Sequence, residues 1–139
     1  MIFIGEQIIA YLQSSLTFPN VKVKDFYSVS TVTPPLVTID ERPGAPLLLP
    51  DGQPRIVQNT YQVEVYTKPV SIDGTVYGKM DAARKLMAET AAFLNDKYGL
   101  TQSGDAIFNT YANDPNVGRG VARFRGVIDT KTEIIYRSV

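Results

Sequence analysis

Few residues in this chain could do chemistry by the common routes. The sequence contains no histidine and no cysteine, so it can build neither a serine-histidine-aspartate triad nor a thiolate nucleophile, and it lacks the usual zinc ligands. A pair of carboxylates could still act as general acid and base. Asp40 and Glu41 cannot form that pair, because neighbouring residues of a strand point to opposite faces. A pair assembled from distant positions, such as Asp40 with Glu64, stays open.

Two glycine-containing segments differ from nucleotide-binding motifs in their spacing. Only three residues separate Gly74 from Gly78, whereas the phosphate-binding loop requires four, and Met80 occupies the position where Ser or Thr would bind magnesium. Gly118 and Gly120 do not match the dinucleotide fingerprint, since a predicted strand and not a helix follows them. We interpret the first pair as loop glycines before a helix and the second pair as flexible turn glycines.

An acidic segment near Asp114 begins like a calcium-binding loop. Its fifth position is Gly118 and its twelfth is Arg125, where a calcium loop needs an oxygen ligand and a bidentate glutamate. The segment therefore predicts a turn and not a metal site. We expect no metal, no cofactor and no catalytic residue.

Three arginines near the C-terminal end could form a binding surface. Arg123 and Arg125 share one face of a predicted strand, opposite Phe124, and Arg119 precedes them. This basic stripe could contact phosphate or an acidic partner. Alternatively, it belongs to an exposed face that nearby acidic residues balance, namely Asp105, Asp114, Asp129 and Glu133. Because 14 basic residues match 14 acidic ones, we favour a protein partner or a balanced face over DNA.

The periodicity of apolar residues predicts the elements that position these side chains. Residues 79–98 repeat apolar positions at intervals of three and four, and Gly99 suits a helix C-cap. Residues 56–67 alternate instead, with Tyr61 and Val63 on one face. The predicted helices span 5–16 and 79–98, and the predicted strands span 21–26, 36–41, 56–67, 106–111, 121–128 and 132–136.

This order of elements predicts an α+β fold. Strands follow one another without strict alternation with helices, so we expect two helices packed on one face of a mostly antiparallel or mixed sheet. The length of 139 residues and a hydrophobic content of 44% suit a single domain, residues 1–139. No apolar run reaches the roughly 20 residues of a membrane-spanning helix, and no signal core is visible at the start. We expect a protein made and kept in a cytoplasm.

A long proline-rich arm, about residues 42–55, is the most unusual feature. Prolines supply no amide protons to a sheet and cannot continue a helix, so this segment predicts an extended arm or loop. Leu47, Leu48 and Leu49 lie among the prolines. Three exposed leucines on a monomer would favour aggregation. We expect the arm either to fold back over its own sheet or to dock on a neighbouring subunit.

The order of these features resembles the tail-terminator, or head-to-tail joining, proteins of long-tailed bacteriophages, often described as minor capsid proteins. The resemblance covers nearly the whole chain. Its elements are the segment Tyr61–Tyr66, the alanine-rich helix that ends at Tyr98-Gly99-Leu100, Phe108–Thr110 with Asn113-Asp114, the stretch Arg119–Asp129 and the close Ile134–Arg137. The resemblance implies a protein that is not an enzyme and that forms a ring, a hexamer, in virion assembly.

Such a ring would cap the tail tube and join it to the head connector. The resemblance implies a tail-tube protein and a head-completion or connector protein as partners, with DNA passing through the lumen without specific binding and no membrane contact. It implies the bacterial cytoplasm during assembly and then the tail of the virion. The assembly interface that we predict comprises Leu47, Leu48, Leu49, Arg119, Arg123 and Arg125. Another head-tail connector, a tail-tube component or a small carboxylate-dependent hydrolase remain alternatives.

Overall fold

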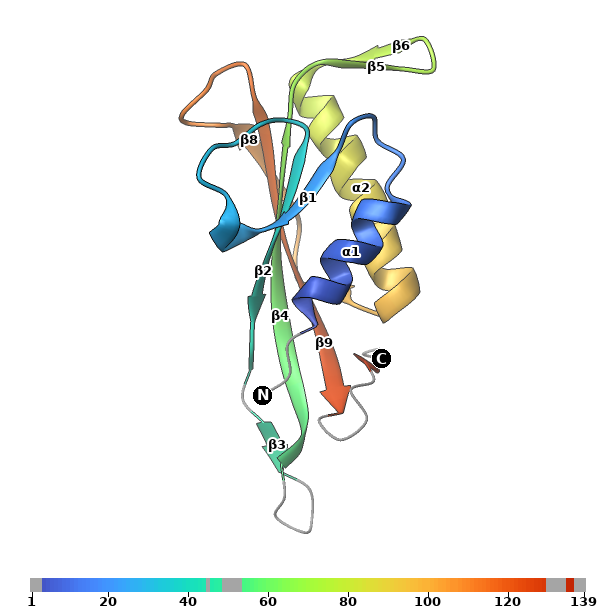
Figure 1. Cartoon of the computed structure of the whole chain (residues 1–139), viewed down its shortest axis with the longest axis vertical. Coiled ribbons are helices and arrows are strands. Elements are labelled where there is room, and N and C mark those ends of the chain that lie inside the picture. The colour runs from blue at the N-terminus through green and yellow to red at the C-terminus, as the bar shows by residue number, and fades with distance from the viewer. Residues whose placement is uncertain (1–3, 45, 49–53, 130–134, 137–139) are drawn as a thin grey trace.

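The computed structural model describes residues 4–44, 46–48, 54–129 and 135–136. Within these residues, two α-helices lie beside an eight-stranded sheet, and a two-stranded hairpin stands at one end (Figure 1). The elements in chain order are α1 (Gly5–Ser15), β1 (Lys22–Asp25), the 3₁₀-helix η1 (Phe26–Ser28), β2 (Leu36–Arg42), β3 (Pro46–Leu48), β4 (Pro54–Thr67), β5 (Val70–Ile72), β6 (Thr75–Tyr77), α2 (Lys79–Tyr98), β7 (Thr101–Gln102), β8 (Ile107–Thr110), β9 (Gly118–Asp129) and β10 (Ile135–Tyr136).

The sheet is mixed and centred on its two longest strands. Its order is β1-β2-β4-β9, and β8, β7 and β10 pair in turn along the far edge of β9. Only β1 and β2 run parallel, whereas the other pairs in the described part of the chain are antiparallel. The predicted α+β class with a mixed sheet is confirmed.

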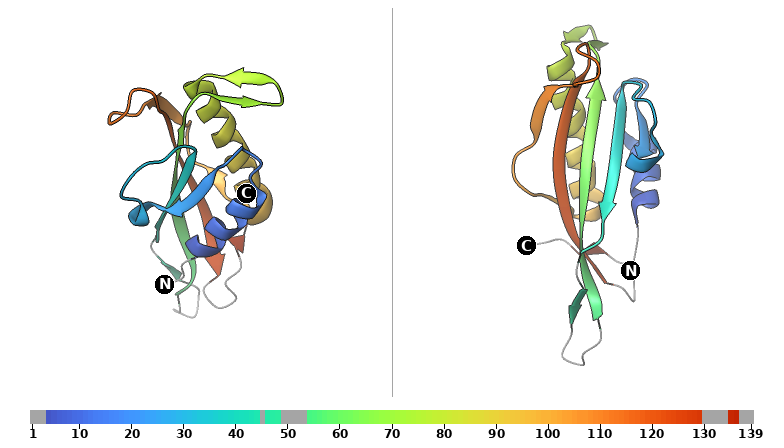
Figure 2. Two further views of the ribbon diagram at one scale, coloured as in Figure 1. Left: turned by 45° about the horizontal axis from the view of Figure 1, so that its top comes forward. Right: turned by 90° about the vertical axis from the view of Figure 1, so that its left-hand side faces the viewer.

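Both helices cover the same face of this sheet. Figure 2 (right) looks at the sheet from the opposite side, with α1 and α2 behind the strands. Alternate residues of the central strands point toward the helices and are buried, as the period of two predicts. The shared core includes Ile8 and Leu12 of α1, Leu86 and Leu94 of α2, Val37 and Ile39 of β2, Val63 and Val65 of β4, and Phe124 of β9.

The edge strand β1 is closed by a side chain of α1. The Gln13 amide donates from Nε2 to the Val21 carbonyl oxygen at 3.0 Å, and its Oε1 accepts from the Val23 amide at 2.8 Å. These bonds occupy backbone groups that would otherwise be available to another strand. The start of the β1 edge is therefore capped from within the chain.

Two segments that we expected to be loops contain strands. Residues 70–77 form the β5-β6 hairpin, whose turn places Asp73 and Gly74 at φ values of 50° and 81°. Asp-Gly is a strong hairpin dipeptide, so the sequence held this signal. Residues 46–48 pair with the start of β4 as an edge strand, where proline is tolerated. Residues 45 and 49–53 of the expected arm lie outside the described residues.

The interpretation of Gly118 and Gly120 as turn glycines is wrong. Both lie within β9, paired with Thr67 and Val65 of β4. A Cβ atom on Gly118 would lie 2.5 Å from the Lys79 carbonyl oxygen, and one on Gly120 would lie 2.7 Å from the Phe108 ring. These glycines therefore allow the start of α2 and the strand β8 to approach β9 closely.

We expect Gly118→Ala to lower the free energy of unfolding by about 1–3 kcal/mol. The added methyl group would collide with the Lys79 carbonyl oxygen, which belongs to the backbone of α2 and cannot move away without the helix. Urea denaturation measures this change. Gly78→Ser is the control. Gly78 is the N-cap of α2 with a φ of −66°, and a Cβ atom added there would meet no other atom within 4 Å. Equal stability losses in the two variants would contradict the packing argument.

Stability should also fall at alkaline pH because of Tyr61. This side chain is 1% exposed, its hydroxyl accepts from Asn59 Nδ2 at 3.2 Å, and burial raises its pKa far above the usual value near 10. A raised pKa in the folded state gives stability that is complete below pH 10 and is lost as the pH rises beyond it.

Urea denaturation at pH 8 and pH 11, with tyrosinate absorbance as the second signal, tests this expectation. Tyr61→Phe should reduce the loss between the two pH values, whereas Tyr27→Phe should not, since Tyr27 is 76% exposed. Ionisation of every tyrosine in the native state at pH 11 would refute the assignment.

Candidate functional site

The face of the sheet opposite α1 and α2, here called the outer face, gathers the polar residues of the central strands. The strand register places these residues in rows that cross the sheet. From one end to the other, the rows are Arg42-Thr60-Arg125, Asp40-Gln62-Arg123, Thr38-Glu64-Val121 and Leu36-Tyr66-Arg119. Charged and aromatic side chains therefore occupy this face. At one end Val29, Val32, Tyr111 and Val117 pack on Leu36 and Tyr66 and form a second, smaller apolar cluster.

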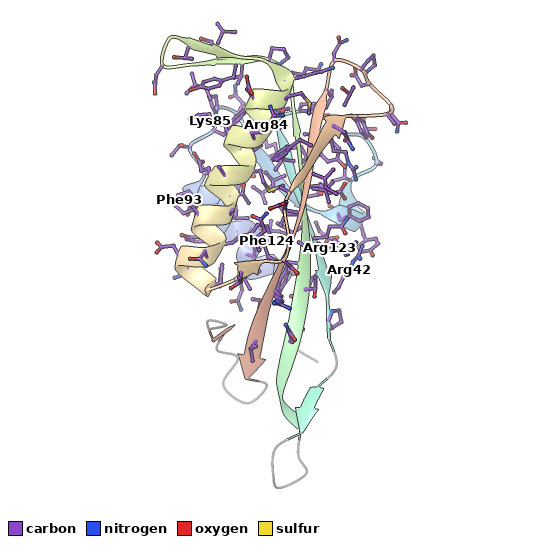
Figure 3. All side chains as sticks on the ribbon, turned by 180° about the vertical axis from the view of Figure 1, so that it is seen from behind. Arg42, Arg84, Lys85, Phe93, Arg123 and Phe124 are labelled. Atoms are coloured by element: carbon purple, nitrogen blue, oxygen red, sulfur yellow. The ribbon has the colours of Figure 1, made fainter. Side chains whose placement is uncertain are left out.

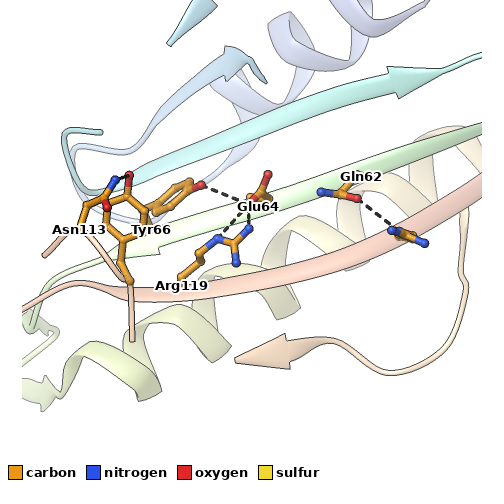
Figure 4. Close-up of polar contacts among 7 residues, drawn as sticks. Gln62, Glu64, Tyr66, Asn113 and Arg119 are labelled. Carbon is orange, nitrogen blue, oxygen red and sulfur yellow. Dashed lines mark hydrogen bonds and ion pairs between the residues drawn. The ribbon is translucent and has the colours of Figure 1, made fainter. Parts of the chain in front are cut away.

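An ion pair lies at the centre of the outer face (Figure 4). Arg119 donates from Nε to Glu64 Oε1 at 2.9 Å and from Nη2 to the same oxygen, and the Tyr66 hydroxyl donates to it at 3.2 Å. The Glu64 side chain is 2% exposed and that of Arg119 is 31% exposed. Glu64 is therefore a buried carboxylate that pairs with one arginine.

The pKa values of the partners reflect this burial. Burial raises the pKa of Tyr66, opposed by its hydrogen bond with Arg119 and assisted by the Glu64 charge. Burial alone would lower the pKa of Arg119, but its hydrogen bonds with Tyr66 and Glu64 outweigh that effect, so its pKa is raised. Tyr66 thus stays protonated as a donor and Arg119 stays charged, which holds the network in one arrangement.

The other arginines of the outer face are more accessible. Arg123 and Arg125 are exposed, and Phe124 between them is buried against the helices, as the sequence predicts. Arg123 donates to Gln62 Oε1 at 3.3 Å, and half-exposed Arg42 contacts Asp40 Oδ2 at 3.1 Å. Figure 3 shows Arg42 and Arg123 away from α2. This end of the outer face carries excess positive charge.

Two buried oxygen atoms of the outer face lack a hydrogen-bond partner among the described residues. They are Thr38 Oγ1 and Asp40 Oδ1, and both residues are 2% exposed. A buried polar atom left unpaired costs roughly 1–3 kcal/mol. Both atoms are on β2, on the face opposite α1 and α2, and the chain itself closes them off from solvent.

Two adjoining hollows occupy the other end of the outer face. The first, here called the aromatic hollow, has a volume of about 350 Å³, and the second, the polar hollow, about 520 Å³. Phe26, Tyr66 and Tyr111 line both hollows. The aromatic hollow is completed by Tyr27, Val29, Ser30, Val32 and Thr38, and the polar hollow by Gln62, Glu64, Asn109, Thr110, Ala112, Asn113 and Arg119.

Edge-to-face aromatic pairs shape the aromatic hollow. Tyr66 and Tyr111 have ring centroids 5.1 Å apart, and so do Phe26 and Tyr27. Asp25 caps η1 by accepting from the Tyr27 amide at 3.1 Å, which holds both η1 aromatics at the rim. Phe26 is 37% exposed and Tyr27 76% exposed. The rings of Phe26 and Tyr27 are therefore partly exposed at the rim of the hollow, on a 3₁₀-helix that Asp25 caps.

The strand register spreads the described residues of the predicted interface along β4 and β9. Arg119 is engaged by Glu64 and is not a free cation, whereas Arg123 and Arg125 remain available. Leu47 and Leu48 lie on β3, at the opposite end of β4 from Tyr66, and Leu49 lies outside the described residues. Along β4, Arg125 pairs with Thr60, toward the β3 end, and Arg119 pairs with Tyr66, toward the other end, so Arg119 is the arginine most distant from the leucines.

Asp40 and Glu41 point to opposite faces of the sheet, as neighbouring residues of a strand must. Asp40 and Glu64 both occupy the outer face, one row apart, and each is held by an arginine. Glu41 lies on the helix side, where it accepts from the Ile4 amide at 2.8 Å. In the described part of the chain, no three acidic residues cluster as metal ligands would. Asp114 caps a turn by accepting from the Asn116 amide at 3.0 Å, as predicted.

No protein-family model matches the chain, and no curated protein is similar to it. Among the described residues, neither helix has the length and hydrophobicity needed to cross a bilayer.

Sequence reasoning missed the aromatic hollow and the buried position of Glu64. The alternation in β4 correctly placed Glu64 opposite the core, but burial there depends on Tyr66 and Arg119, which only the strand register brings together. Two adjacent aromatic residues, Phe26 and Tyr27, come directly after an alternating strand, and this position could have indicated that at least one of them is exposed. The contact of these residues with the distant Tyr111 was not readable from local sequence.

We expect Arg119→Ala to lower the free energy of unfolding by about 2 kcal/mol, because it leaves the Glu64 carboxylate buried without its cation. Arg123→Ala is the matched control on the same strand and face, and it should change stability by less than about 0.5 kcal/mol. Chemical denaturation measures both values. A loss in Arg119→Ala no larger than the control would show that the ion pair contributes nothing.

Proposed function

We propose that this protein is a structural assembly subunit that forms a ring, a hexamer, on the end of a phage tail tube and joins the tail to the head connector. The observation that carries the proposal is the outer face, which has exposed arginines at one end and an aromatic hollow at the other. Such a face suits contact with another protein surface.

The composition of this face supports protein contact over catalysis. Aromatic residues and arginine are the types enriched at the centres of protein interfaces. Asp40 and Glu64, the carboxylate pair that a hydrolase would require, are each neutralised by an arginine. The resemblance of the whole chain to tail-terminator proteins supports the specific role, with the tail-tube protein and the head connector as partners. DNA would pass through the lumen without specific binding.

Assembly in solution provides the first test. Size-exclusion chromatography with light scattering, and negative-stain microscopy with tail tubes present, should show rings or capped tube ends. Free monomer alone would not contradict the proposal, since such rings can close on their template. A chain that stays monomeric at high concentration and leaves tail tubes bare would overturn it.

The phenotype of removal separates this role from related ones. Loss of a terminator should leave tails of uncontrolled length that do not join heads. Loss of a tube component should leave heads without tails, and loss of a head-completion protein should leave normal tails beside leaking heads. A cytoplasmic site during assembly and a virion site afterwards would follow from the proposed role.

Replacement of Leu47, Leu48 and Leu49 with serine should impair ring formation more than folding if the arm is an interface. We expect at least about a tenfold loss of assembly with a thermal midpoint within about 2 °C of the parent. Light scattering and thermal denaturation measure the two effects. A large drop of the midpoint in the isolated subunit would instead assign the leucines to its own core.

A further inference from the structure

A third hollow, here called the lysine hollow, lies beside the edge strand β1. Its volume is about 330 Å³, and its lining residues are Asn20, Lys22, Lys24, Thr31, Thr33, Pro34, Pro35 and Leu36. The polar side chains of these residues end in two ammonium groups, two hydroxyl groups and one amide, all of which can donate hydrogen bonds. None of the described residues that line the hollow is acidic. A lining of cations and hydrogen-bond donors is suited to an anion.

Strand β1 places the two lysines on one face, close to each other. Lys22 pairs with Leu36 and Lys24 with Thr38, two residues of β2 that belong to the outer face. Two residues along a strand correspond to roughly 7 Å. Both lysines are exposed, neither forms an ion pair with another described residue, and the next residue, Asp25, caps η1 instead. Two like charges therefore lie side by side without a carboxylate to balance them.

The opposite wall of the lysine hollow comes from the segment between η1 and β2, which arches beside β1 (Figure 1). The Lys22 amide donates to the Pro35 carbonyl oxygen at 3.1 Å, which ties this segment to β1. Val32 packs into the smaller apolar cluster of the outer face, while its neighbours Thr31 and Thr33 are exposed. The chain therefore holds the threonine hydroxyls and the lysines around the same hollow.

Phosphate matches this lining better than a carboxylate does. A phosphate monoester carries a charge of about −1.5 to −2 at neutral pH and three acceptor oxygens, so two ammonium groups and two hydroxyl groups can all bind it. A carboxylate would leave one lysine unbalanced. Hollows that bind small molecules start at roughly 300 Å³, which leaves room for the alcohol or sugar part of a phosphate ester. Two lysines are few for a DNA duplex, whose binding depends on many neutralised phosphates.

We propose that the lysine hollow binds the phosphate group of a small molecule, as free phosphate or as a phosphate ester. Lys22 and Lys24 supply the positive charge, and Thr31 and Thr33 donate hydrogen bonds to the phosphate oxygens. The site is separate from the interface residues discussed above and does not depend on the proposed function, because neither ring formation nor contact with a tail tube requires it.

Titration of the whole chain with inorganic phosphate and with glycerol 3-phosphate, at constant ionic strength, tests the site. Calorimetry measures affinity, and amide signals in ¹H-¹⁵N NMR spectra locate the binding. We expect saturable binding of at least one probe below about 10 mM, with the largest shifts in residues 20–24 and 31–33. Tighter binding of the ester would support a phosphate ester as the ligand, and tighter binding of inorganic phosphate would support free phosphate.

The variant Lys22→Gln/Lys24→Gln should weaken phosphate binding by about tenfold or more with an unchanged thermal midpoint, since both side chains are exposed. The matched control is Lys85→Gln/Lys97→Gln, which removes the same charge from exposed positions of α2, on the opposite side of the sheet. The control should change the affinity by less than about twofold, because distant exposed charges are screened.

Equal weakening in both variants, or shifts spread over the whole surface, would overturn the proposal, since net charge alone would then explain the binding. The absence of saturable binding to either probe would overturn it as well. A short DNA duplex that binds through the same two lysines more tightly than either small probe would assign them to DNA and also overturn it. None of these results decides whether the chain forms rings, so the proposed function stands or falls by its own tests.

Discussion

The antiparallel ladder between β4 and β9 is the constraint on which the other features depend. It runs without interruption from the Ile56–Asp129 pair to the Thr67–Gly118 pair. A ladder of this length fixes which side chains face each other, and a slip by one residue would move every side chain to the other face. The same register therefore determines which residues form the core under the helices and which side chains, such as Glu64 and Arg119, meet on the outer face.

The two faces of the sheet differ in polarity because α1 and α2 pack on only one of them. Both α1 and α2 pack on one side, so the apolar alternate residues are buried there and the polar ones stay on the outer face. A face with buried Glu64 and unpaired Thr38 and Asp40 oxygens is costly for an isolated subunit.

Local patterns predicted most of the elements. The helix at 79–98 and the strands near 22–25, 36–42 and 118–129 were readable because helix and strand periods differ and neighbouring residues reveal them. Gly118 and Gly120 were misread, since a glycine that permits close approach looks like a turn glycine until its neighbour is known. The β5-β6 hairpin was missed although its Asp-Gly dipeptide signalled a turn.

The sequence by itself determined the class of fold, the face of β4 that enters the core, the absence of histidine and cysteine chemistry, and the proline-rich composition of residues 43–54. Only the tertiary structure decided that Arg119 neutralises Glu64, that Phe26 and Tyr27 meet Tyr66 and Tyr111 around one hollow, and that this hollow lies far from β3. The reason is physical: periodicity is encoded by adjacent residues, whereas pairing across a sheet depends on register between segments far apart in the chain, such as Glu64 and Arg119 at a separation of 55 residues.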